Sequence, residues 1–485
     1  MSASAYFGWA LVNLTICLQI VYLVRALLRP HREPASRLAW IVVIVVAPVV
    51  GVVAYILFGD TNVGSRRIAR LRDALQRLPS LATINTTDLD GREQPSVPEP
   101  YAPLFRVGES ISNYAPVGAN RAQLMPGSDA AIDAIIADID TAADHVHLLF
   151  YIWLPDTNGV KMVEAVKRAA MRGVTCRVMV DDIGSRRLIR SPHWRDMASV
   201  KVKLARALPV GIALLRPLKG RVDMRNHRKI VVIDNKVTYC GSQNCADPAF
   251  AIKARYAPWV DVMLRFEGPV VLQNQHLFAS DWMAQVQEDL SPLMRQPLPS
   301  ARPGFTAQVI GTGAAVRYSA MPEMFIALMN AARRELVIST PYYVPDEPLQ
   351  AALCACGHRG VATTIVLPRR NDSWIVAAAS RSYYRELLDA GVRIHEYEGG
   401  LLHAKTLTVD GEVTLIGSAN LDRRSFELNF ENNILLHDAE VTGEVRARQQ
   451  SYIESSVPIS DRMVAKWSRP RQVWNNAIAM LGPVL

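Results

Sequence analysis

The sequence has 485 residues, of which 50% are hydrophobic, and its formal net charge is +9. This length allows two or three domains that each bury a core, and the basic excess indicates an anionic partner, whether nucleic acid, an acidic lipid surface or a phosphorylated substrate. Six cysteines are too few for a disulfide scaffold of this size, and the pair Cys354 and Cys356 lacks the neighbouring thiols or imidazoles of a zinc site.

Two apolar runs near the N-terminus, residues 2–24 and 38–58, contain no charged residue. Each approaches the roughly 20 residues that a helix needs to cross a bilayer. Three polar residues interrupt the first run: Asn13, Thr15 and Gln19. A cleaved signal peptide is the alternative for the first run, although it normally begins with basic residues, and a buried core helix is the alternative for either run alone. The two runs in tandem favour a transmembrane helical hairpin over residues 1–60.

Arginines on either side of the second run give opposite signals about orientation. Four lie in the connection between the runs: Arg25, Arg29, Arg32 and Arg37. Five follow the second run: Arg66, Arg67, Arg70, Arg72 and Arg77. In a hairpin of two spans these groups lie on opposite sides of the membrane. The preference of basic residues for the cytoplasmic side therefore leaves the side of the remaining chain open.

Residues 61–119 are predicted to connect the hairpin to the rest of the chain. Residues 68–78 fit a short basic amphipathic helix, which would lie either on anionic headgroups or in solvent. Residues 83–103 are polar and contain several prolines, as is typical of an extended linker.

The remainder reads as two copies of one α/β pattern, which we place at residues 120–300 and 301–485. The first copy has a helix, a strand, a helix and a strand at residues 130–143, 147–153, 160–171 and 176–180. The second copy repeats this order, with a helix ending near residue 332 and strands at 336–340 and 363–367. Strands that alternate with helices predict a mixed or parallel sheet covered by helices. We therefore predict an α/β fold of two duplicated units, packed as a pseudo-twofold pair.

The duplication is sharpest in a motif of six positions, each repeated 176 residues later. The first copy consists of His227, Lys229, Asp234, Gly241, Ser242 and Asn244, and the second of His403, Lys405, Asp410, Gly417, Ser418 and Asn420. A single H-x-K carries no information, but two copies of H-x-K-x4-D-x6-G-S-x-N in register are very improbable by chance.

The spacing of the motif indicates phosphate chemistry. Alternate residues of a strand share a face, so the histidine and lysine of each copy point the same way. A strand, a hairpin turn and a return strand then bring Gly-Ser-x-Asn beside them. Lysine supplies positive charge for a phosphate, serine and asparagine supply hydrogen bonds, and histidine acts as nucleophile or proton carrier. Two such units facing each other would place one histidine on each side of a phosphodiester.

Other motif positions have simpler explanations. Asp234 and Asp410 stand at strand ends before turns, so we give them a supporting role within the catalytic motif. Gly241 and Gly417 meet backbone requirements of the hairpin. The arrangement does not resemble a metal cage, so we expect catalysis without a metal ion or other cofactor.

The duplicated motif resembles that of the phospholipase D superfamily, over roughly residues 120–485. The apolar hairpin and both motif stretches are similar to those of bacterial cardiolipin synthases, which places the chain in the inner membrane. A C-terminal segment that would lie on the membrane or pack as a terminal helix carries Trp467, Arg469, Arg471 and Trp474. The resemblance implies two phospholipase D-type repeats behind a transmembrane hairpin with two spans.

The resemblance also implies roles for individual residues. One histidine would attack phosphorus to form a covalent phosphohistidine, and the other would protonate the leaving alcohol. By position His227 is the nucleophile and His403 the general acid and then base, although the two could be exchanged. In the family a downstream carboxylate orients each histidine. Glu431 fits His403, and Asp261 is the looser candidate for His227.

The implied reaction joins two phosphatidylglycerol molecules into cardiolipin and glycerol. The catalytic set is then His227, Lys229, Asp234, His403, Lys405 and Asp410, and the phosphate-binding set is Ser242, Asn244, Ser418 and Asn420. Partners would be phosphatidylglycerol and anionic membrane lipids and not nucleic acid; the oligomeric state is open, and includes a homo-oligomer. A hydrolytic phospholipase D is the first alternative, and a nucleic-acid phosphodiesterase is the second.

Overall fold

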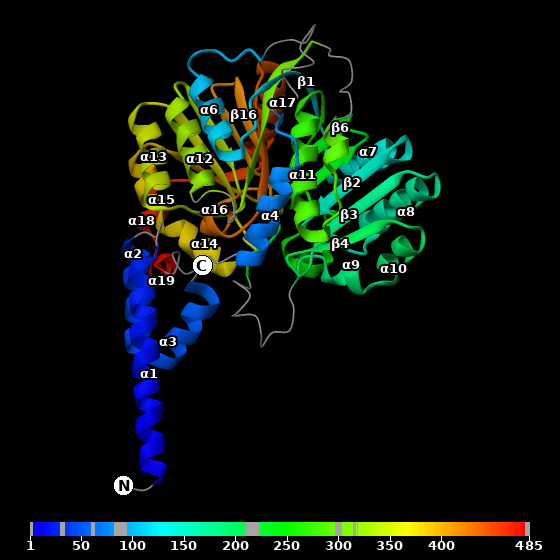
Figure 1. Cartoon of the computed structure of the whole chain (residues 1–485). Coiled ribbons are helices and arrows are strands. Elements are labelled where there is room, and N and C mark those ends of the chain that lie inside the picture. Colours follow the sequence, from blue (N-terminus) through cyan, green and yellow to red (C-terminus); the bar gives the residue numbers. More distant parts are fainter. Residues whose placement is uncertain are drawn as a thin grey trace.

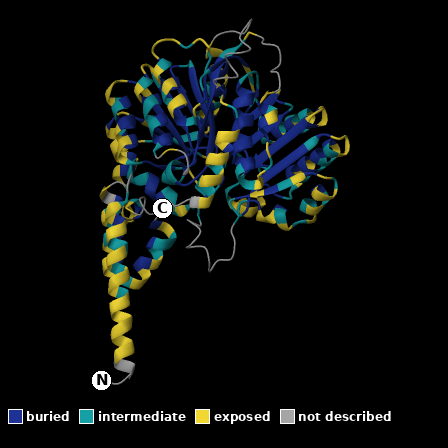
Figure 2. Cartoon of the chain, in the orientation of Figure 1, coloured by how far each residue is buried: buried dark blue, intermediate teal, exposed yellow. Residues whose placement is uncertain are grey.

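The computed structural model describes residues 3–29, 34–59, 64–81, 95–209, 223–295, 303–313, 317 and 319–480. Figure 1 shows a long N-terminal helix that projects from an α/β body with two halves. Figure 2 shows that the strands of both halves are buried, whereas the projecting helix is exposed along most of its length.

Among the described residues, one continuous sheet of 15 strands forms the body. At its centre β1 (Val117–Leu124) pairs antiparallel with β9 (Phe305–Thr312). Outward from β1 follow β8 (Met263–Glu267), β6 (Val237–Gly241), β5 (Ile230–Ile233), β2 (His145–Phe150), β3 (Thr175–Asp181) and β4 (Lys203–Ala207). Outward from β9 follow β18 (Glu431–His437), β16 (Val413–Gly417), β15 (Thr406–Val409), β10 (Glu335–Ser339), β12 (Ala362–Pro368), β13 (Arg393–Tyr397) and β19 (Ser456–Ile459).

The two halves of the sheet have the same strand order, apart from the extra edge strand β19. In each half the motif hairpin is antiparallel (β5–β6 and β15–β16), and the outer strands beyond it run parallel. This arrangement confirms the predicted mixed sheet and the duplication. The apolar, largely β-branched runs of β5 and β15 are wholly buried, as expected for strands covered on both faces.

Helices cover both halves of the sheet (Figure 1). The first half carries α7 (Ser128–Asp140), α8 (Thr157–Met171), α9 (Arg186–Arg190), α10 (Pro192–Ser199) and α11 (Val270–Val286). The second half carries α12 (Ala320–Ala331), α13 (Glu347–His358), α14 (Trp374–Ser382), α15 (Tyr384–Asp389), α16 (Arg423–Glu427), α17 (Ala439–Glu454), α18 (Asp461–Ala465) and α19 (Arg469–Ala479). Aspartates cap the equivalent helices α8 and α13, because Asp156 and Asp346 accept hydrogen bonds from backbone N–H groups of the first turn.

In the described part of the predicted connector, two helices, α4 (Ser65–Arg77) and α6 (Ala102–Ser112), pack on the body. In α4, Ala74 is buried in the central core, and Ile68 and Leu71 pack against Met224 and its neighbours. The apolar face of this amphipathic helix is therefore covered by protein, while its basic face is exposed. The choice between headgroups and solvent for that exposed face stays a prediction. The second helix, α6, buries one face in the core of the second half, through Leu104, Phe105 and Ile111. Residues 82–94 of the predicted linker lie outside the described residues.

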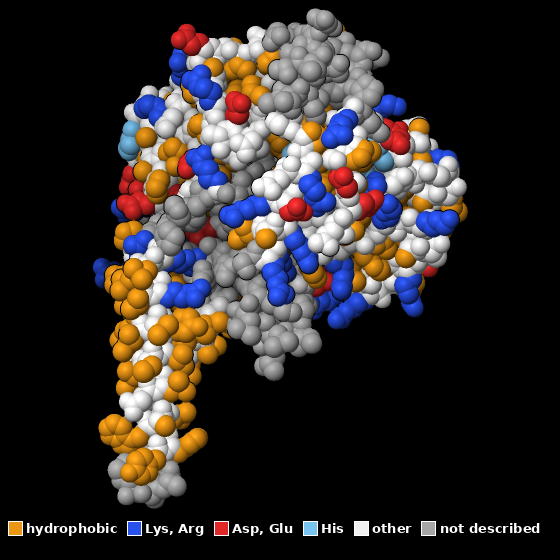
Figure 3. Space-filling model, in the orientation of Figure 1, with side chains coloured by type: hydrophobic (Ala, Val, Ile, Leu, Met, Phe, Trp, Pro, Cys, Tyr) orange, Lys and Arg blue, Asp and Glu red, His pale blue; other side chains and the backbone are white. Residues whose placement is uncertain are grey.

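The N-terminal runs differ from each other. In α1 (Ala3–Leu28), residues Tyr6–Leu28 form a helix long and apolar enough to cross a membrane. Figure 3 shows its hydrophobic side chains exposed along the projecting part. The second run is divided into α2 (Pro34–Val46), α3 (Pro48–Ala54) and a π-helical turn η1 (Tyr55–Gly59). A hairpin of two spanning helices is thus not confirmed, because Pro48 has no N–H to continue the helix from α2.

Candidate active site

Both motif histidines lie in short segments where the two repeats pair with each other. Just before β5, the backbone N–H of His227 donates to the carbonyl of Phe430, 2.9 Å away. In the equivalent place, the N–H of His403 donates to the carbonyl of Val260, 2.8 Å away. The second contact extends a short parallel pair between β7 (Trp259–Val260) and β14 (Leu401–Leu402). Each histidine is therefore fixed to a segment of the opposite repeat.

This pairing decides which carboxylate each histidine contacts. His227 Nδ1 lies 2.9 Å from Glu431 Oε2, and His403 Nδ1 lies 2.6 Å from Asp261 Oδ1. The expectation that Glu431 orients His403 and Asp261 orients His227 is wrong, because the partners are exchanged between repeats. The physical reason is that the segment leading to each carboxylate pairs with the histidine segment of the other repeat.

The motif serines hold these carboxylates. Ser242 Oγ donates to Asp261 Oδ1 at 2.6 Å, and Ser418 Oγ donates to Glu431 Oε2 at 2.5 Å. Each Oγ also accepts a backbone N–H, from Val262 and Asn432 respectively. Both hydroxyls are thus occupied within the protein. The structure gives the serines a positioning role through the carboxylates in place of the predicted contact with phosphate.

Each motif lysine is buried and holds the turn that carries its histidine. Lys229 Nζ donates to the carbonyl of His227 at 2.6 Å, and Lys405 Nζ donates to the carbonyl of His403 at 2.7 Å. An ammonium has three N–H donors, so this contact leaves two on each lysine for a phosphate oxygen. Burial of two cations beside two histidines makes the site attractive to an anion.

The motif asparagines are both buried next to the motif serines. Asn244 Oδ1 accepts the N–H of Ile152 at 3.1 Å, which orients its amide. Within the described part of the chain, Asn420 Oδ1 is buried and accepts no hydrogen bond. Buried polar atoms usually have partners, so this oxygen is consistent with a site that a polar ligand completes.

Asp234 and Asp410 lie at the far ends of β5 and β15, seven residues after the histidines. At roughly 3.3 Å per residue, this separation is about 20 Å along a strand. Asp234 accepts backbone N–H groups at the start of β2, and Asp410 accepts those at the start of β10. Their role is structural, which agrees with the supporting role that their position suggested. Their inclusion in the predicted catalytic set is wrong, because they do not reach the reacting atoms.

Two aromatic rings beside the histidines were not found from the sequence. The ring of Tyr151 lies 4.8 Å from that of His227, and the ring of Trp259 lies 4.6 Å from that of His403. Tyr151 directly follows β2, and Trp259 stands two residues before Asp261. The available signal for Tyr151 was its position directly after a predicted strand, but many aromatic residues occupy such positions.

Burial shifts the pKa of every ionisable group in the site. It lowers the pKa of His227 to about 4, against the opposing effect of Glu431, and it also lowers the pKa of His403. Burial lowers the pKa of Lys229 to about 8 and that of Lys405 to about 7. His403 and its neighbours lower the pKa of Asp261 to about 2 despite burial, so this carboxylate remains ionised.

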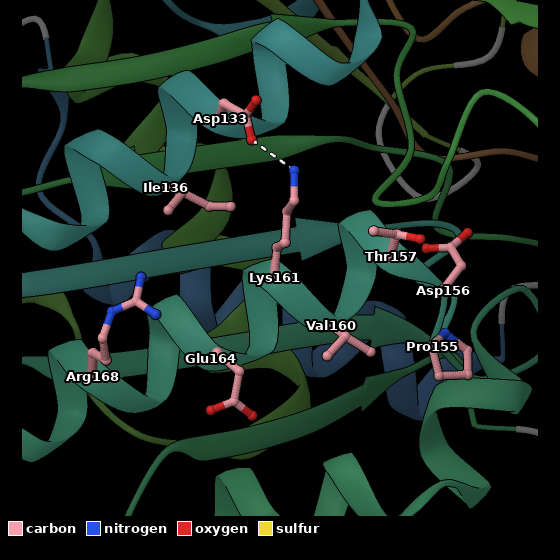
Figure 4. A pocket seen from close by; sticks show the side chains of 9 residues that line it. All are labelled: Asp133, Ile136, Pro155, Asp156, Thr157, Val160, Lys161, Glu164 and Arg168. Carbon is pink, nitrogen blue, oxygen red and sulfur yellow. Dashed lines mark hydrogen bonds and ion pairs between the residues drawn. The ribbon is translucent and has the colours of Figure 1, made fainter.

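A surface groove between α7 and α8 is unrelated to these residues (Figure 4). Its walls carry an exposed ion pair between Lys161 and Asp133, 3.2 Å apart. None of the residues that line it belongs to either motif. Among the described residues, no group of three or more His, Cys, Asp or Glu side chains could hold a metal ion.

Comparison with known proteins identifies close counterparts. The family described as cardiolipin synthase, phospholipase D-like domain, matches residues 135–282 and 325–453, and the family described as phospholipase D-nuclease N-terminal matches residues 17–59. Cardiolipin synthase A of Edwardsiella ictaluri is 35% identical over 490 residues, which cover 98% of this chain and 96% of the relative. Cardiolipin synthase A of Citrobacter koseri is 37% identical over 456 residues, which cover 91% and 92%.

Among solved structures, the chain is similar to the crystal structure of phosphatidylserine synthase from Haemophilus influenzae Rd KW20. The TM-score is 0.58 at 15% sequence identity, over 79% of this chain and 100% of that chain. This similarity supports the duplicated α/β fold.

Proposed function

The chain belongs to the cardiolipin synthases with phospholipase D-like domains, and on this basis we propose that it converts two phosphatidylglycerol molecules into cardiolipin and glycerol. Its relatives make it a phosphatidyltransferase. The observation that carries the proposed mechanism is the pair of buried histidines, each hydrogen-bonded at Nδ1 to a carboxylate of the other repeat. Such a pair supplies a nucleophile and a proton carrier, and no cofactor takes part in the proposed steps.

In the first step His227 forms a covalent bond to the lipid. Its Nδ1–H donates to Glu431, which leaves the lone pair of Nε2 directed away from the carboxylate. Nε2 attacks phosphorus of the first phosphatidylglycerol, and the bond from phosphorus to the headgroup glycerol oxygen breaks. Protonated His403 gives its proton to that oxygen, so glycerol leaves as a neutral alcohol. A phosphatidyl group remains on His227.

In the second step the phosphatidyl group moves to a lipid alcohol. His403, now neutral, accepts the proton of a headgroup hydroxyl of the second phosphatidylglycerol, and the oxygen of this hydroxyl attacks phosphorus. The phosphorus–nitrogen bond breaks, its electron pair returns to Nε2 of His227, and cardiolipin leaves. One phosphodiester replaces another, so the exchange needs no nucleotide.

The electrostatics of the site suit these roles once substrate binds. With its pKa lowered to about 4, His227 is neutral at physiological pH and can attack. The lowered pKa of His403 keeps this ring mainly neutral in the free protein, so it has no proton to give to the leaving group. A phosphodiester brings a negative charge between the two rings, which favours the protonated form of His403. Binding of the substrate therefore creates the acid that the first step needs.

We propose that this reaction takes place at the bacterial inner membrane, with α1 as the membrane anchor. Tyr6–Leu28 is long and apolar enough to cross a bilayer. Phosphatidylglycerol and other anionic lipids would then be the partners of the chain, and its net charge of +9 suits such a surface.

Product analysis tests the proposal most directly. The full-length protein in detergent is incubated with phosphatidylglycerol alone, with a metal chelator present, and lipids and glycerol are quantified. We expect cardiolipin and glycerol in equal amounts. Phosphatidic acid as the main product would make the protein a hydrolase, and activity lost to the chelator and restored by a divalent metal would contradict the cofactor-free mechanism. His358→Gln, at the exposed end of α13, is the matched control for the histidine variants discussed below.

A further inference from the structure

We infer that the second apolar run forms a re-entrant hairpin, in which α2 and α3 both meet the bilayer surface on the side of the α/β body. The chain then crosses the membrane once, through α1. This inference rests on the membrane anchorage in the proposed function and is independent of the reaction.

Neither arm of the second run is long enough to cross. At 1.5 Å per residue, the 13 residues of α2 extend over about 20 Å. The seven residues of α3 and the five of η1 extend over about 18 Å. The hydrocarbon core of a bilayer is roughly 30 Å thick, so each arm would end inside it. By the same measure the 26 residues of α1 extend over about 39 Å, which is sufficient.

The chain reverses between the two arms at Ala47. This residue has non-helical dihedral angles (φ −131°, ψ 76°), and Pro48 begins the next helix. A Cβ atom at Gly51 would overlap the carbonyl group of Val43, so glycine allows α3 to approach the backbone of α2.

Aromatic contacts show that the middle parts of the two arms lie side by side. The ring of Tyr55, after α3, is 5.3 Å from the ring of Trp40 in α2, although Ala47 lies between them in the sequence. Tyr55 is also 5.9 Å from Tyr22, which belongs to the body-proximal part of α1. In Figure 1, α2 and α3 accompany only this part of α1, and the N-terminal part of α1 continues beyond them.

The helix break at Pro48 leaves a backbone carbonyl of α2 that receives a hydrogen bond from α1. Pro48 cannot donate to Ile44, the residue four positions earlier, so the carbonyl of Ile44 loses its helical partner. Gln19 Nε2 of α1 donates to this oxygen at 3.1 Å. Within a bilayer a backbone oxygen requires such a partner. In contrast, Thr15 Oγ1 bonds only the carbonyl of Leu11 in its own helix, 2.9 Å away.

The arrangement also resolves the conflict between the two groups of arginines. With a single crossing, the arginines between the two apolar runs and those of α4 lie on the same side, the side of the body. These described residues are Arg25, Arg29, Arg37, Arg66, Arg67, Arg70, Arg72 and Arg77. Their common side is then the cytoplasmic side, and the N-terminus lies on the opposite side.

Exposed tryptophans mark the level of the membrane surface on the body. Trp374 of α14 and Trp474 of α19 are 61% and 52% exposed, and their rings stack 5.8 Å apart. In Figure 1 both helices lie at the height where α2 begins. Tryptophan favours the membrane–water interface, so this height agrees with the level at which the re-entrant hairpin would leave the bilayer.

Cysteine accessibility in intact bacterial cells tests the inference. Three variants, each with one added cysteine, are made in a Cys17→Ser background, because Cys17 is exposed in α1 and the other five native cysteines are buried. Tyr6→Cys probes the N-terminal end of α1, Arg29→Cys the connection between α1 and α2, and Ser199→Cys the body. A membrane-impermeant thiol reagent is added from outside the cell, and again after lysis. Elution of each variant as a single species in detergent shows that it folds.

We expect the reagent to label Tyr6→Cys from outside, and Arg29→Cys and Ser199→Cys only after lysis. Labelling of Arg29→Cys on the side opposite to Ser199→Cys would establish two spans and overturn the inference. Labelling of all three on one side, with release of the protein from membranes at alkaline pH, would refute the anchorage itself. Loss of lipid transfer with the expected labelling pattern would refute the proposed reaction and leave the topology intact.

Discussion

The two halves of the site share one skeleton and differ in the groups attached to it. In both, a histidine follows a cross-repeat backbone contact and is hydrogen-bonded through Nδ1 to a carboxylate. In the first half the carboxylate is Glu431 and the adjacent ring is Tyr151. In the second half they are Asp261 and Trp259. Duplication thus supplies two similar histidines, and the neighbouring residues distinguish the attacking base from the proton carrier.

The side-chain hydrogen bonds that hold the two carboxylates also differ between the halves. Glu431 accepts hydrogen bonds from Ser418 and from Asn429 Nδ2, the latter at 3.1 Å. Asp261 accepts one from Ser242, and its contact with His403 is the shorter of the two histidine contacts, at 2.6 Å. A short contact to an ionised carboxylate stabilises an imidazolium, which suits the histidine that carries the proton.

Removing either histidine is expected to have the largest effect and to separate their roles. His227→Asn and His403→Asn should each reduce the transfer rate by roughly 10⁴-fold or more, as for nucleophile and base substitutions elsewhere. On an aryl phosphodiester, whose leaving group needs no proton, His403→Asn should still release the phenol in a single burst. His227→Asn should release none. Stopped-flow absorbance measures the burst, and His358→Gln serves as the control.

A burst from His227→Asn, with none from His403→Asn, would exchange the two roles. Equal bursts from both variants would show that neither histidine is a dedicated nucleophile, and would contradict the covalent mechanism.

Replacing the carboxylates tests their crosswise pairing. Glu431→Gln and Asp261→Asn should each lower the transfer rate by about 10²- to 10⁴-fold, because the imidazolium loses its partner. The Glu431 charge raises the pKa of His227 against burial, so Glu431→Gln should lower this pKa further. Nitrogen-15 NMR of the imidazoles measures it. Asp261→Asn is the matched control, and a larger shift of His227 in that variant would contradict the pairing.

The two motifs and the carboxylates that contact their histidines also show what could be predicted from the sequence. The motif is local: histidine, lysine, turn and serine follow one another within two strands, so spacing alone located them. The carboxylates act at a distance of 204 residues for His227 and 142 for His403. Proximity along the chain suggested the wrong carboxylate for each histidine. Only the assembled pseudo-twofold sheet brings Glu431 and Asp261 to the histidines of the opposite repeats.

The predicted hairpin of two spans in the N-terminal region is not confirmed, for a different reason. Residues 38–58 are apolar on all sides, so no periodicity marked the reversal at Ala47. Pro48 was the available signal, but membrane helices tolerate proline. Gln19 appeared only to weaken the first run, and its hydrogen bond to Ile44 becomes meaningful once the two runs are seen together.

The lysines should make the reaction sensitive to alkaline pH, and the second half more so than the first. Burial lowers the pKa of Lys405 to about 7 and of Lys229 to about 8, so both lose their positive charge as pH rises through these values. Transfer at low substrate concentration, kcat/KM, should therefore fall by about tenfold per pH unit above the first value. Bound phosphate favours the charged form of both lysines. The fall of kcat at saturating substrate should therefore begin at a higher pH than the fall of kcat/KM. A pH profile of kcat/KM that stays flat to pH 10 would refute this role.

The smallest expected effect distinguishes the two serines. Ser242→Ala removes a hydrogen bond to Asp261 and should lower kcat by about tenfold, in the range found for residues that orient a catalytic group. Ser418→Ala should cost less, because Asn429 still donates to Glu431. The double variant Ser418→Ala/Asn429→Ala should restore the larger loss. A greater effect of Ser418→Ala than of Ser242→Ala in single-turnover rates would show that Asn429 does not support Glu431. The functional asymmetry of the site would then have to come from the rings beside the histidines.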